Sequence, residues 1–337
     1  MNRFEYVRAD SVADAIRALE GPDAQALAGG TNLVDLMKYD VVRPRRVVDI
    51  NRLPLRTIEA MPDGGLKIGT LVSNSELAWD RRVVKRYPLL ASAILAGASA
   101  QLRNAATTGG NLLQRTRCYY FYDPSTACNK REPGSGCSAI GGVNRIHAIL
   151  GASDSCIAVH PSDMCVALAA LDAIVHLEGA GGRRTLSFSE FHRLPADRPQ
   201  HDNTMRAGEL ITAIELPASD FSENYTYIKV RDRLSFAFAL VSVAAALRIE
   251  DGAIVEARLA LGGVAHKPWR DRGAEQGLRG KVPDQSAFSS CADAILHEAK
   301  GCGQNNFKIE LARRTIIRAL RQAAAGTPQD QADKVVR

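Results

Sequence analysis

The sequence has no stretch of apolar residues long enough to cross a membrane, and its N-terminus has no apolar core. A spanning helix needs about 20 predominantly apolar residues, and residues 1–8 carry charge throughout instead of opening a signal peptide. We therefore expect no membrane span and no Sec-type signal on this chain. Export would then have to depend on a partner that carries the signal.

Short motifs that would identify a catalytic or nucleotide site are also missing. The sequence has neither the C-x2-C pairs of a zinc ribbon nor the C-x4-C-x2-C of plant-type [2Fe–2S] proteins. G-x-G-x-x-G, the P-loop motif, G-x-S-x-G and H-E-x-x-H are absent as well. His160 and His266 stand near proline in loops, where a structural role is the default. We therefore predict no catalytic residue on this chain.

Charge of one sign is only slightly in excess, because 43 Lys and Arg against 37 Asp and Glu give a net charge of +6. The basic residues are scattered, and the groups at 43–46 and 313–321 lack interleaved aromatic residues that would stack on bases. We interpret them as solvated surface or as a contact for a protein partner, and we expect no nucleic acid. Seven cysteines, an odd number, argue against a complete disulfide framework.

The composition that remains is that of an average globular protein, with 46% hydrophobic and 24% charged residues. At about 150 residues per domain, a chain of 337 residues suggests two domains. Strand and helix patterns alternate in the first part, which predicts an α/β arrangement, while hairpin and helix patterns dominate the last third. We place the domains at 1–221 and 222–325, followed by a polar tail at 326–337.

Individual elements follow from hydrophobic periodicity and turn signals. Ser73-Asn74-Ser75-Glu76 has the form of a capping box and predicts the start of a helix, and Asp251-Gly252 predicts a hairpin turn. Strands are expected at 24–28, 46–50, 55–61, 66–72, 173–177, 210–216, 237–249 and 253–261, and helices at 11–20, from 33 onward, at 88–98, 164–171, 291–300 and 308–324.

The cysteines are unevenly distributed, and five of the seven fall within 48 residues. Residues 117–138 show neither strand nor helix periodicity, and a long structureless segment inside a compact domain is normally functional or disordered. Four thiolates suit a [4Fe–4S] cluster, around which such a loop can fold, whereas free thiols in a flexible loop are the alternative. The candidate ligands are Cys118, Cys128, Cys137 and Cys156; Cys165, Cys291 and Cys302 are assigned to structure.

Two Gly-Gly pairs are related in sequence. Gly29-Gly30-Thr31-Asn32-Leu33 and Gly109-Gly110-Asn111-Leu112 each lead into an apolar segment. Glycine lets backbone N–H groups converge, and a helix N-terminus adds partial positive charge, so a diphosphate would suit both places. Plain turns explain the same pattern equally well, and the spacing alone does not decide between them.

Three motifs in this order resemble the FAD-binding subunit of the xanthine dehydrogenase family of molybdenum hydroxylases. They are residues 28–33 (Ala-Gly-Gly-Thr-Asn-Leu), 106–112 (Ala-Thr-Thr-Gly-Gly-Asn-Leu) and 261–265 (Leu-Gly-Gly-Val-Ala) with Pro268, and the resemblance covers nearly the whole chain. Residues 114–118, 128–131 and 133–137 resemble, more narrowly, the flavoprotein subunit of bacterial periplasmic aldehyde oxidoreductases. In that group an insertion carries a [4Fe–4S] cluster.

The resemblance implies an α+β fold. A FAD-binding domain of the PCMH type, with two α/β subdomains, would occupy 1–221 and carry the iron–sulfur insertion at about 116–158. The C-terminal flavoprotein domain would be α+β, with an antiparallel sheet and helices. The resemblance implies contacts to FAD from two pyrophosphate loops and three single residues. The first loop is Ala26, Leu27, Ala28, Gly29, Gly30, Thr31, Asn32, Leu33 and Val34, and the second is Thr107, Gly109, Gly110 and Asn111. Asp163 would reach ribityl or ribose hydroxyls, Ile211 would make an apolar contact, and Lys229 would be a basic position near the isoalloxazine ring.

The resemblance also implies a role. The chain would be the electron-transfer flavoprotein subunit of a molybdenum-dependent aldehyde oxidoreductase, which converts an aldehyde and water to a carboxylic acid. Electrons would pass from [2Fe–2S] centres on a small partner subunit to FAD here, while a large partner holds the molybdenum cofactor. Such a heterotrimer would reach the periplasm with a signal-bearing partner, or else remain cytoplasmic. A purine or aromatic acyl-thioester hydroxylase subunit, and a non-enzymatic iron–sulfur scaffold, are the alternatives.

Overall fold

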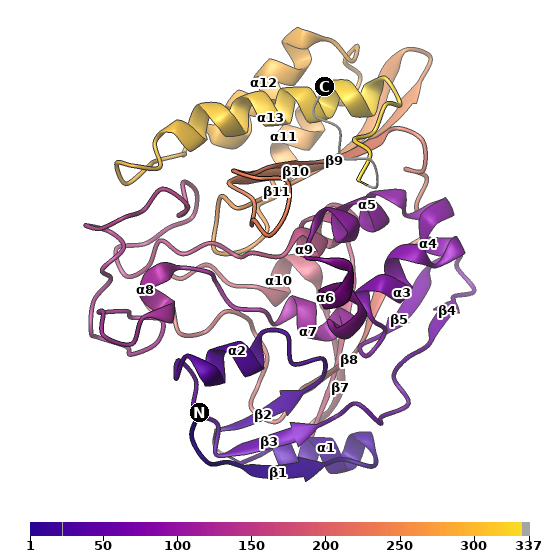
Figure 1. Cartoon of the computed structure of the whole chain (residues 1–337). Helices are drawn as coiled ribbons and strands as arrows, with labels where there is room; N and C mark the ends of the chain where they lie inside the picture. The colour runs from indigo at the N-terminus through magenta and orange to yellow at the C-terminus, as the bar shows by residue number, and fades with distance from the viewer. Residues whose placement is uncertain (22, 332–337) are drawn as a thin grey trace.

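A computed structural model describes residues 1–21 and 23–331 and contains three β-sheets (Figure 1). The first sheet is parallel, with β1 (Glu5–Arg8), β3 (Arg46–Asp49) and β2 (Ala24–Leu27) side by side in that order. Parallel neighbours need crossover connections, which α1 (Val12–Leu19) and α2 (Leu33–Lys38) provide. The predicted α/β beginning of the chain is thereby confirmed.

The second sheet is antiparallel and has the order β4-β5-β8-β6-β7. Its strands come from two distant parts of the chain: β4 (Ile58–Ala60) and β5 (Leu66–Gly69), then β6 (Ile174–Gly179), β7 (Gly182–Ser187) and β8 (Leu210–Leu216). The intervening helices are α3 (Asn74–Trp79), α4 (Arg81–Arg86), α5 (Pro88–Ala96), α6 (Ala100–Ala105), α7 (Thr108–Leu112), α8 (Tyr119–Tyr122) and α9 (Asp163–Ala170), and α10 (Phe188–Phe191) follows β7.

Side-chain caps fix where two of these helices begin. Ser73 accepts a hydrogen bond from the Glu76 N–H while the Glu76 carboxylate accepts one from the Ser73 N–H, so the predicted capping box is confirmed. Ser162 caps α9 by accepting from the Cys165 N–H at 3.0 Å. This cap places Asp163 in the first turn of α9, facing the C-terminal sheet.

The third sheet is antiparallel and carries β9 (Tyr225–Val230), β10 (Val241–Glu250) and β11 (Ala253–Gly262) in the order β11-β10-β9. Asp251 and Gly252 have φ values of +50° and +77°, as a two-residue hairpin turn between twisted strands requires. The helices α11 (Arg272–Gly277), α12 (Gln285–Leu296) and α13 (Phe307–Ala324) follow; α13 packs on β9 and β10, and α12 packs on α13 and α11.

One hydrophobic core joins the two halves. The helices α5 and α9 lie between the five-stranded sheet and the C-terminal sheet, so Leu90 and Val166 share a core with Tyr227 and Ala244. All four side chains are at most 2% exposed. The C-terminal sheet therefore packs against α5 and α9 and covers one side of the part of the structure formed by the first 221 residues.

Some boundaries differ from those predicted. β9 was not predicted, β10 begins at Val241 instead of 237, and α12 begins at Gln285 instead of 291. The first turn of α12 is polar and is fixed by the Asp284 cap, so its hydrophobic periodicity starts only later. Of the predicted tail, residues 326–331 form neither helix nor strand, and 332–337 lie outside the described residues.

The cysteine-bearing segment has little regular structure, as predicted. Between α7 and α9, residues 113–162 contain only the four-residue helix α8 and two isolated bridges, one of which joins Cys128 to Cys137. Among the described residues, no helix is long and apolar enough to cross a membrane.

Candidate functional site

A cavity of about 480 Å³ lies where the first sheet, the helices α5 to α7 and the C-terminal sheet meet. Fourteen of the sixteen residues predicted to contact FAD line it, although they come from seven separate elements and loops. Leu27 and Val34 do not line it, because their side chains pack beside Gly30, within 3.4 Å and 3.0 Å of where its Cβ would stand. The predicted contacts thus converge on one place, and their roles toward FAD stay predictions.

The first Gly-Gly loop offers unused backbone donors. Within the described part of the chain, the N–H groups of Gly29, Gly30, Thr31, Asn32 and Leu33 have no hydrogen-bond acceptor. Gly30 has a φ of +70°, a conformation that L-residues rarely adopt, and a Cβ on Gly29 would lie 1.8 Å from the Ala105 carbonyl oxygen. Both glycines are therefore required by the turn itself, and the turn leaves a row of donors suited to phosphate oxygens.

The second Gly-Gly loop differs from the expectation. The N–H groups of Thr108 and Gly109 donate to the carbonyls of Val72 and Thr70, each at 2.9 Å, and the Gly110 N–H donates to the Thr107 hydroxyl at 3.3 Å. The N–H groups of these three residues are therefore not free for a diphosphate, which favours the plain turn that the spacing left open at this loop. Gly109 is required instead because a Cβ there would stand 1.8 Å from the Thr70 hydroxyl oxygen.

Asp163 and Lys229, predicted separately, form one buried group with Tyr227. The Lys229 ammonium donates to Asp163 Oδ2 at 2.7 Å, and the Tyr227 hydroxyl donates to Asp163 Oδ1 at 2.7 Å. The side chains of Asp163 and Lys229 are 8% and 4% exposed. A carboxylate has about four acceptor positions, so Asp163 keeps capacity for a ligand hydroxyl on the cavity side.

Two arginines that the sequence did not identify also line the cavity. Arg103 donates from Nη1 to the Gly97 and Ala98 carbonyls at 2.7 and 3.1 Å, while its buried Nε has no partner among the described residues. Arg231 donates to the Ala96 carbonyl at 3.2 Å. Neither residue belongs to a motif, so only the folded chain reveals these two cations, in addition to Arg115 and Arg117, at a cavity suited to a diphosphate.

The four predicted metal ligands meet at a second, smaller cavity. Cys118, Cys128, Cys137 and Cys156 all line it, and all but Cys137 are buried. Burial, with a smaller effect of the neighbouring thiols, raises the pKa of Cys118 to about 12 and that of Cys156 to about 11. As free thiols Cys118 and Cys156 are neutral, and a metal centre that replaces their protons would relieve the cost of burying a thiolate.

Two further groups lie beside the cysteines without lining their cavity. His147 Nε2 lies 3.1 Å from Cys118 Sγ, and burial lowers the pKa of this histidine to about 4, so that it is neutral. Cys302, which was assigned to structure, lies beside the same cluster and its pKa is raised by burial and then by Cys137. Its position 165 residues after Cys137 gave no sign of this proximity.

The other two cysteines lie elsewhere. Cys291 is buried in the C-terminal core, and Cys165 is buried in α9 against His160 and His192, with ligand atoms within 4.8 Å of one another. Burial raises the pKa of Cys165 to about 12 and lowers the pKa of both histidines, so the three groups are neutral. The structure therefore separates Cys165 from the cysteine cavity.

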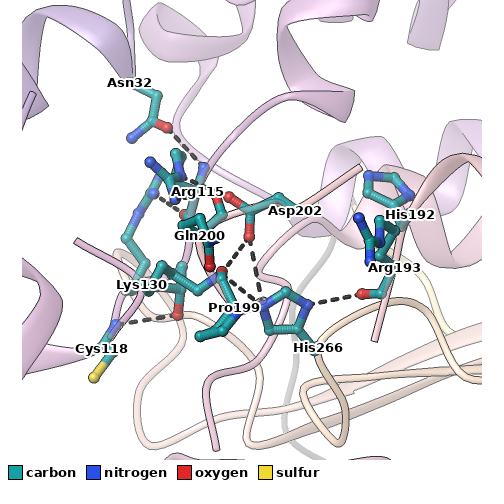
Figure 2. A network of polar contacts seen from close by, with 12 residues as sticks. Asn32, Arg115, Cys118, Lys130, His192, Arg193, Pro199, Gln200, Asp202 and His266 are labelled. Carbon is teal, nitrogen blue, oxygen red and sulfur yellow. Dashed lines mark hydrogen bonds and ion pairs between the residues drawn. The ribbon is translucent and has the colours of Figure 1, made fainter. Parts of the chain in front are cut away.

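A polar network connects the two cavities (Figure 2). The Arg115 N–H donates to Asn32 Oδ1 at 2.8 Å, and its guanidinium Nε donates to Asp202 Oδ2 at 2.6 Å. The other oxygen of Asp202 accepts from Lys130 at 2.5 Å, and Lys130 lines the cysteine cavity. Arg115 and Lys130 lower the pKa of Asp202 although burial opposes them, so this residue is a carboxylate.

Comparisons with known proteins agree with this arrangement. Residues 2–219 match the family described as the FAD binding domain in molybdopterin dehydrogenase, and residues 225–323 match the CO dehydrogenase flavoprotein C-terminal domain. The aldehyde oxidoreductase FAD-binding subunit PaoB of Escherichia coli K12 is 47% identical over 96% of this chain and 99% of its own length. The glyceraldehyde dehydrogenase medium chain of Sulfolobus acidocaldarius is 29% identical over 87% and 86%.

Solved structures extend the comparison to the fold. A chain of the carbon monoxide dehydrogenase of Hydrogenophaga pseudoflava superposes with a TM-score of 0.76 at 27% identity, covering 96% of this chain and 98% of that one. A chain of quinoline 2-oxidoreductase from Pseudomonas putida 86 gives 0.74 at 25% identity, covering 97% and 98%.

Proposed function

The chain belongs to the family of FAD-binding subunits of molybdenum hydroxylases, and on that premise we propose that it serves a molybdenum-dependent aldehyde oxidoreductase. The observation that carries the proposal is the 47% identity, over nearly the full length of both chains, to an aldehyde oxidoreductase FAD-binding subunit. Relatives that act on other substrates are more distant, at 25 to 27% for carbon monoxide dehydrogenase medium chains.

The larger cavity fits FAD by the chemistry of its donors. The free N–H groups of the first Gly-Gly loop and the guanidinium of Arg103 would hold the diphosphate. Asp163 would accept from a cofactor hydroxyl, and Ile211 would contact an apolar part of the cofactor. When bound, FAD supplies the redox chemistry, accepting electrons and passing them on, while these residues bind and orient it.

The cysteine cavity fits a [4Fe–4S] cluster by the same kind of test. Cys118, Cys128, Cys137 and Cys156 supply four thiols from one segment that has almost no regular structure of its own. Four thiolates are the usual ligand set of such a cluster, and cluster binding would add to the stability of the segment. His147 would donate its Nε2–H to the Cys118 sulfur, with no partner on its Nδ1 in the described structure.

Partners and location complete the proposal. A small [2Fe–2S] subunit would deliver electrons, a large subunit would hold the molybdenum cofactor and oxidise the aldehyde, and this chain would pass electrons to an external acceptor. The names of two relatives call them medium chains, which supports an assembly with smaller and larger subunits. We place the complex in the periplasm by co-export with a signal-bearing partner, with the cytoplasm as the alternative.

Purification of the complex with its natural partners tests the assignment. We expect flavin, iron and molybdenum together, and turnover of a panel of aldehydes with an artificial electron acceptor. Turnover of purines or aromatic acyl thioesters instead would move the chain to another branch of the family. Iron without flavin would favour a scaffold. Fractionation of cells that express this chain alone should find it in the cytoplasm, and its presence in the periplasm without partners would contradict co-export.

A further inference from the structure

Lys130 is a buried lysine whose ammonium is fully hydrogen-bonded beside the cysteine cavity. It is 3% exposed, and Figure 2 shows its Nζ at the centre of three acceptors. These are the Pro199 carbonyl oxygen at 2.6 Å, Asp202 Oδ1 at 2.5 Å and His266 Nε2 at 2.6 Å. An ammonium has three N–H donors, so all of them are used.

The hydrogen bonds of His266 determine which group carries the proton. Its Nδ1 lies 2.8 Å from the Arg193 carbonyl oxygen, which can only accept, so Nδ1 carries the hydrogen and Nε2 presents its lone pair to Lys130. Burial, and to a smaller extent the nearby charge of Lys130, lowers the pKa of His266 to about 4. The histidine is therefore neutral and the positive charge resides on Lys130.

The network around Lys130 has one positive charge in excess. Among the described residues, Asp202 is the only carboxylate hydrogen-bonded in this network, and Arg115 and Lys130 both donate to it. The side chains of Arg115 and Asp202 are only 23% and 22% exposed, so water compensates the excess charge incompletely. A buried charge of this kind is expected to have a counter-ion nearby.

The cysteine cavity is where that counter-charge would be. Lys130 lines it together with all four candidate ligands. A cluster held by four thiolates has a net negative charge, which grows by one when the cluster takes up an electron. A fixed positive charge in the wall of the cavity stabilises the reduced cluster more than the oxidised cluster.

We propose that Lys130 is the counter-charge of the metal–thiolate centre and raises its reduction potential, with Asp202 and His266 as positioning residues that hold the ammonium against the cavity. This inference rests on the proposed [4Fe–4S] cluster. The inference adds a residue of this chain that raises the reduction potential of the cluster without being one of its ligands. A lysine that served only to connect two segments would contribute stability and leave the potential unchanged.

The test is a redox titration of the full complex, followed by the electron paramagnetic resonance signal of the reduced cluster, with dithionite as the one-electron donor. In Lys130→Met we expect iron content close to wild type and a midpoint shifted to a more negative potential. The expected shift changes the ratio of reduced to oxidised cluster at least tenfold at a fixed potential, which is 59 mV for one electron. Lys130→Arg should restore most of the wild-type midpoint.

Asp202→Asn should shift the midpoint potential in the opposite direction, and it therefore serves as a control for misfolding. The amide keeps an oxygen for Lys130 but removes the negative charge, so the midpoint should become more positive than in wild type. Misfolding would not move the two variants in opposite directions. Arg270→Met is the matched control, because Arg270 is another buried cation, paired with Asp172 and Glu275, and does not line the cysteine cavity. It should lower stability and leave the midpoint unchanged.

The outcomes separate the two proposals. Wild-type iron content with an unchanged midpoint in both Lys130→Met and Asp202→Asn would overturn the counter-charge role and leave the cluster in place. Wild-type complex without about four irons per chain in addition to those of its partner would overturn the cluster assignment, and the role of Lys130 with it.

Discussion

The ammonium of Lys229 and the carboxylate of Asp163 are 2.7 Å apart, and both side chains are more than nine-tenths buried. Lys229 lies on β9 in the C-terminal sheet and Asp163 lies in the first turn of α9, so this ion pair joins the C-terminal sheet to the cavity wall. It also means that neither residue can be substituted without effects on its partner.

We expect Asp163→Ala to lower the free energy of unfolding by about 3–5 kcal/mol, because it leaves the Lys229 charge buried and unpaired. The double variant Asp163→Ala/Lys229→Met should recover most of this loss, since no unpaired charge remains. FAD affinity should stay about ten- to a hundredfold weaker in the double variant, because the acceptor for a cofactor hydroxyl is gone. Denaturant unfolding and flavin titration measure the two effects. Wild-type FAD affinity in the double variant would exclude the Asp163 contact.

Arg103→Met tests the diphosphate end of the cavity. Its guanidinium lines the cavity and would pair with a phosphate oxygen, a charge-assisted bond worth about 1.5–3 kcal/mol, so FAD should dissociate about ten- to a hundredfold more readily from the variant. The control is Arg82→Met, whose guanidinium is bound to Asp80 and the Ile58 carbonyl, away from the cavity. Equal FAD affinity in the two variants would contradict the placement of the diphosphate.

Four buried histidines make the fold sensitive to acid. Burial lowers the pKa of His147, His192 and His266 to about 4 and that of His160 well below 6.5. In the unfolded chain they titrate near 6.5, so between about pH 6.5 and pH 4 the unfolded state binds more protons. Stability is therefore fully present above pH 6.5 and falls as the pH drops, by about 1.4 kcal/mol per unit of pH for each histidine.

The measurement is the melting temperature of the complex from pH 7.5 to 5. We expect a steady decrease on acidification and a shallower one in His192→Gln, whose amide can still donate to the Leu112 carbonyl that His192 Nε2 contacts at 2.9 Å. A melting temperature that does not depend on pH over this range would show that these histidines are not neutral in the folded chain.

The iron ligands are tested by cysteine substitution. Single Cys→Ser variants at 118, 128, 137 and 156 should each lower the iron content of this chain toward zero while FAD remains near stoichiometric, because the flavin cavity does not include them. Cys302→Ser is the most demanding control, since Cys302 lies beside Cys137. Loss of iron in Cys302→Ser with retention in Cys156→Ser would revise the ligand set.

The sequence predicted the parts of the fold that depend on local signals. The capping box at Ser73, the turn at Asp251-Gly252 and the strands β2, β3 and β8 follow from residues within a few positions of one another. β9 was missed because its six residues follow directly on an irregular stretch, and its pairing partner β10 lies later in the chain.

The site divides in the same way. The two Gly-Gly loops were recognisable as motifs. The N–H groups of the second loop, however, donate to the carbonyls of Thr70 and Val72, which are distant in sequence, so these hydrogen bonds could not be predicted. Arg103, Cys302 and the Lys130 network are likewise products of long-range packing. Lys130 and Asp202 are 72 residues apart, and no spacing rule joins them.

The central claim is that this chain carries electrons on a bound flavin, and an anaerobic reduction experiment tests it directly. An aldehyde is added to the purified complex, and the visible absorption of oxidised FAD is followed. We predict that the aldehyde bleaches the flavin absorption of the complex, and that it does not bleach the isolated flavin-loaded chain without its partners. A flavin that remains oxidised while the complex converts aldehyde to acid and reduces another acceptor would contradict it.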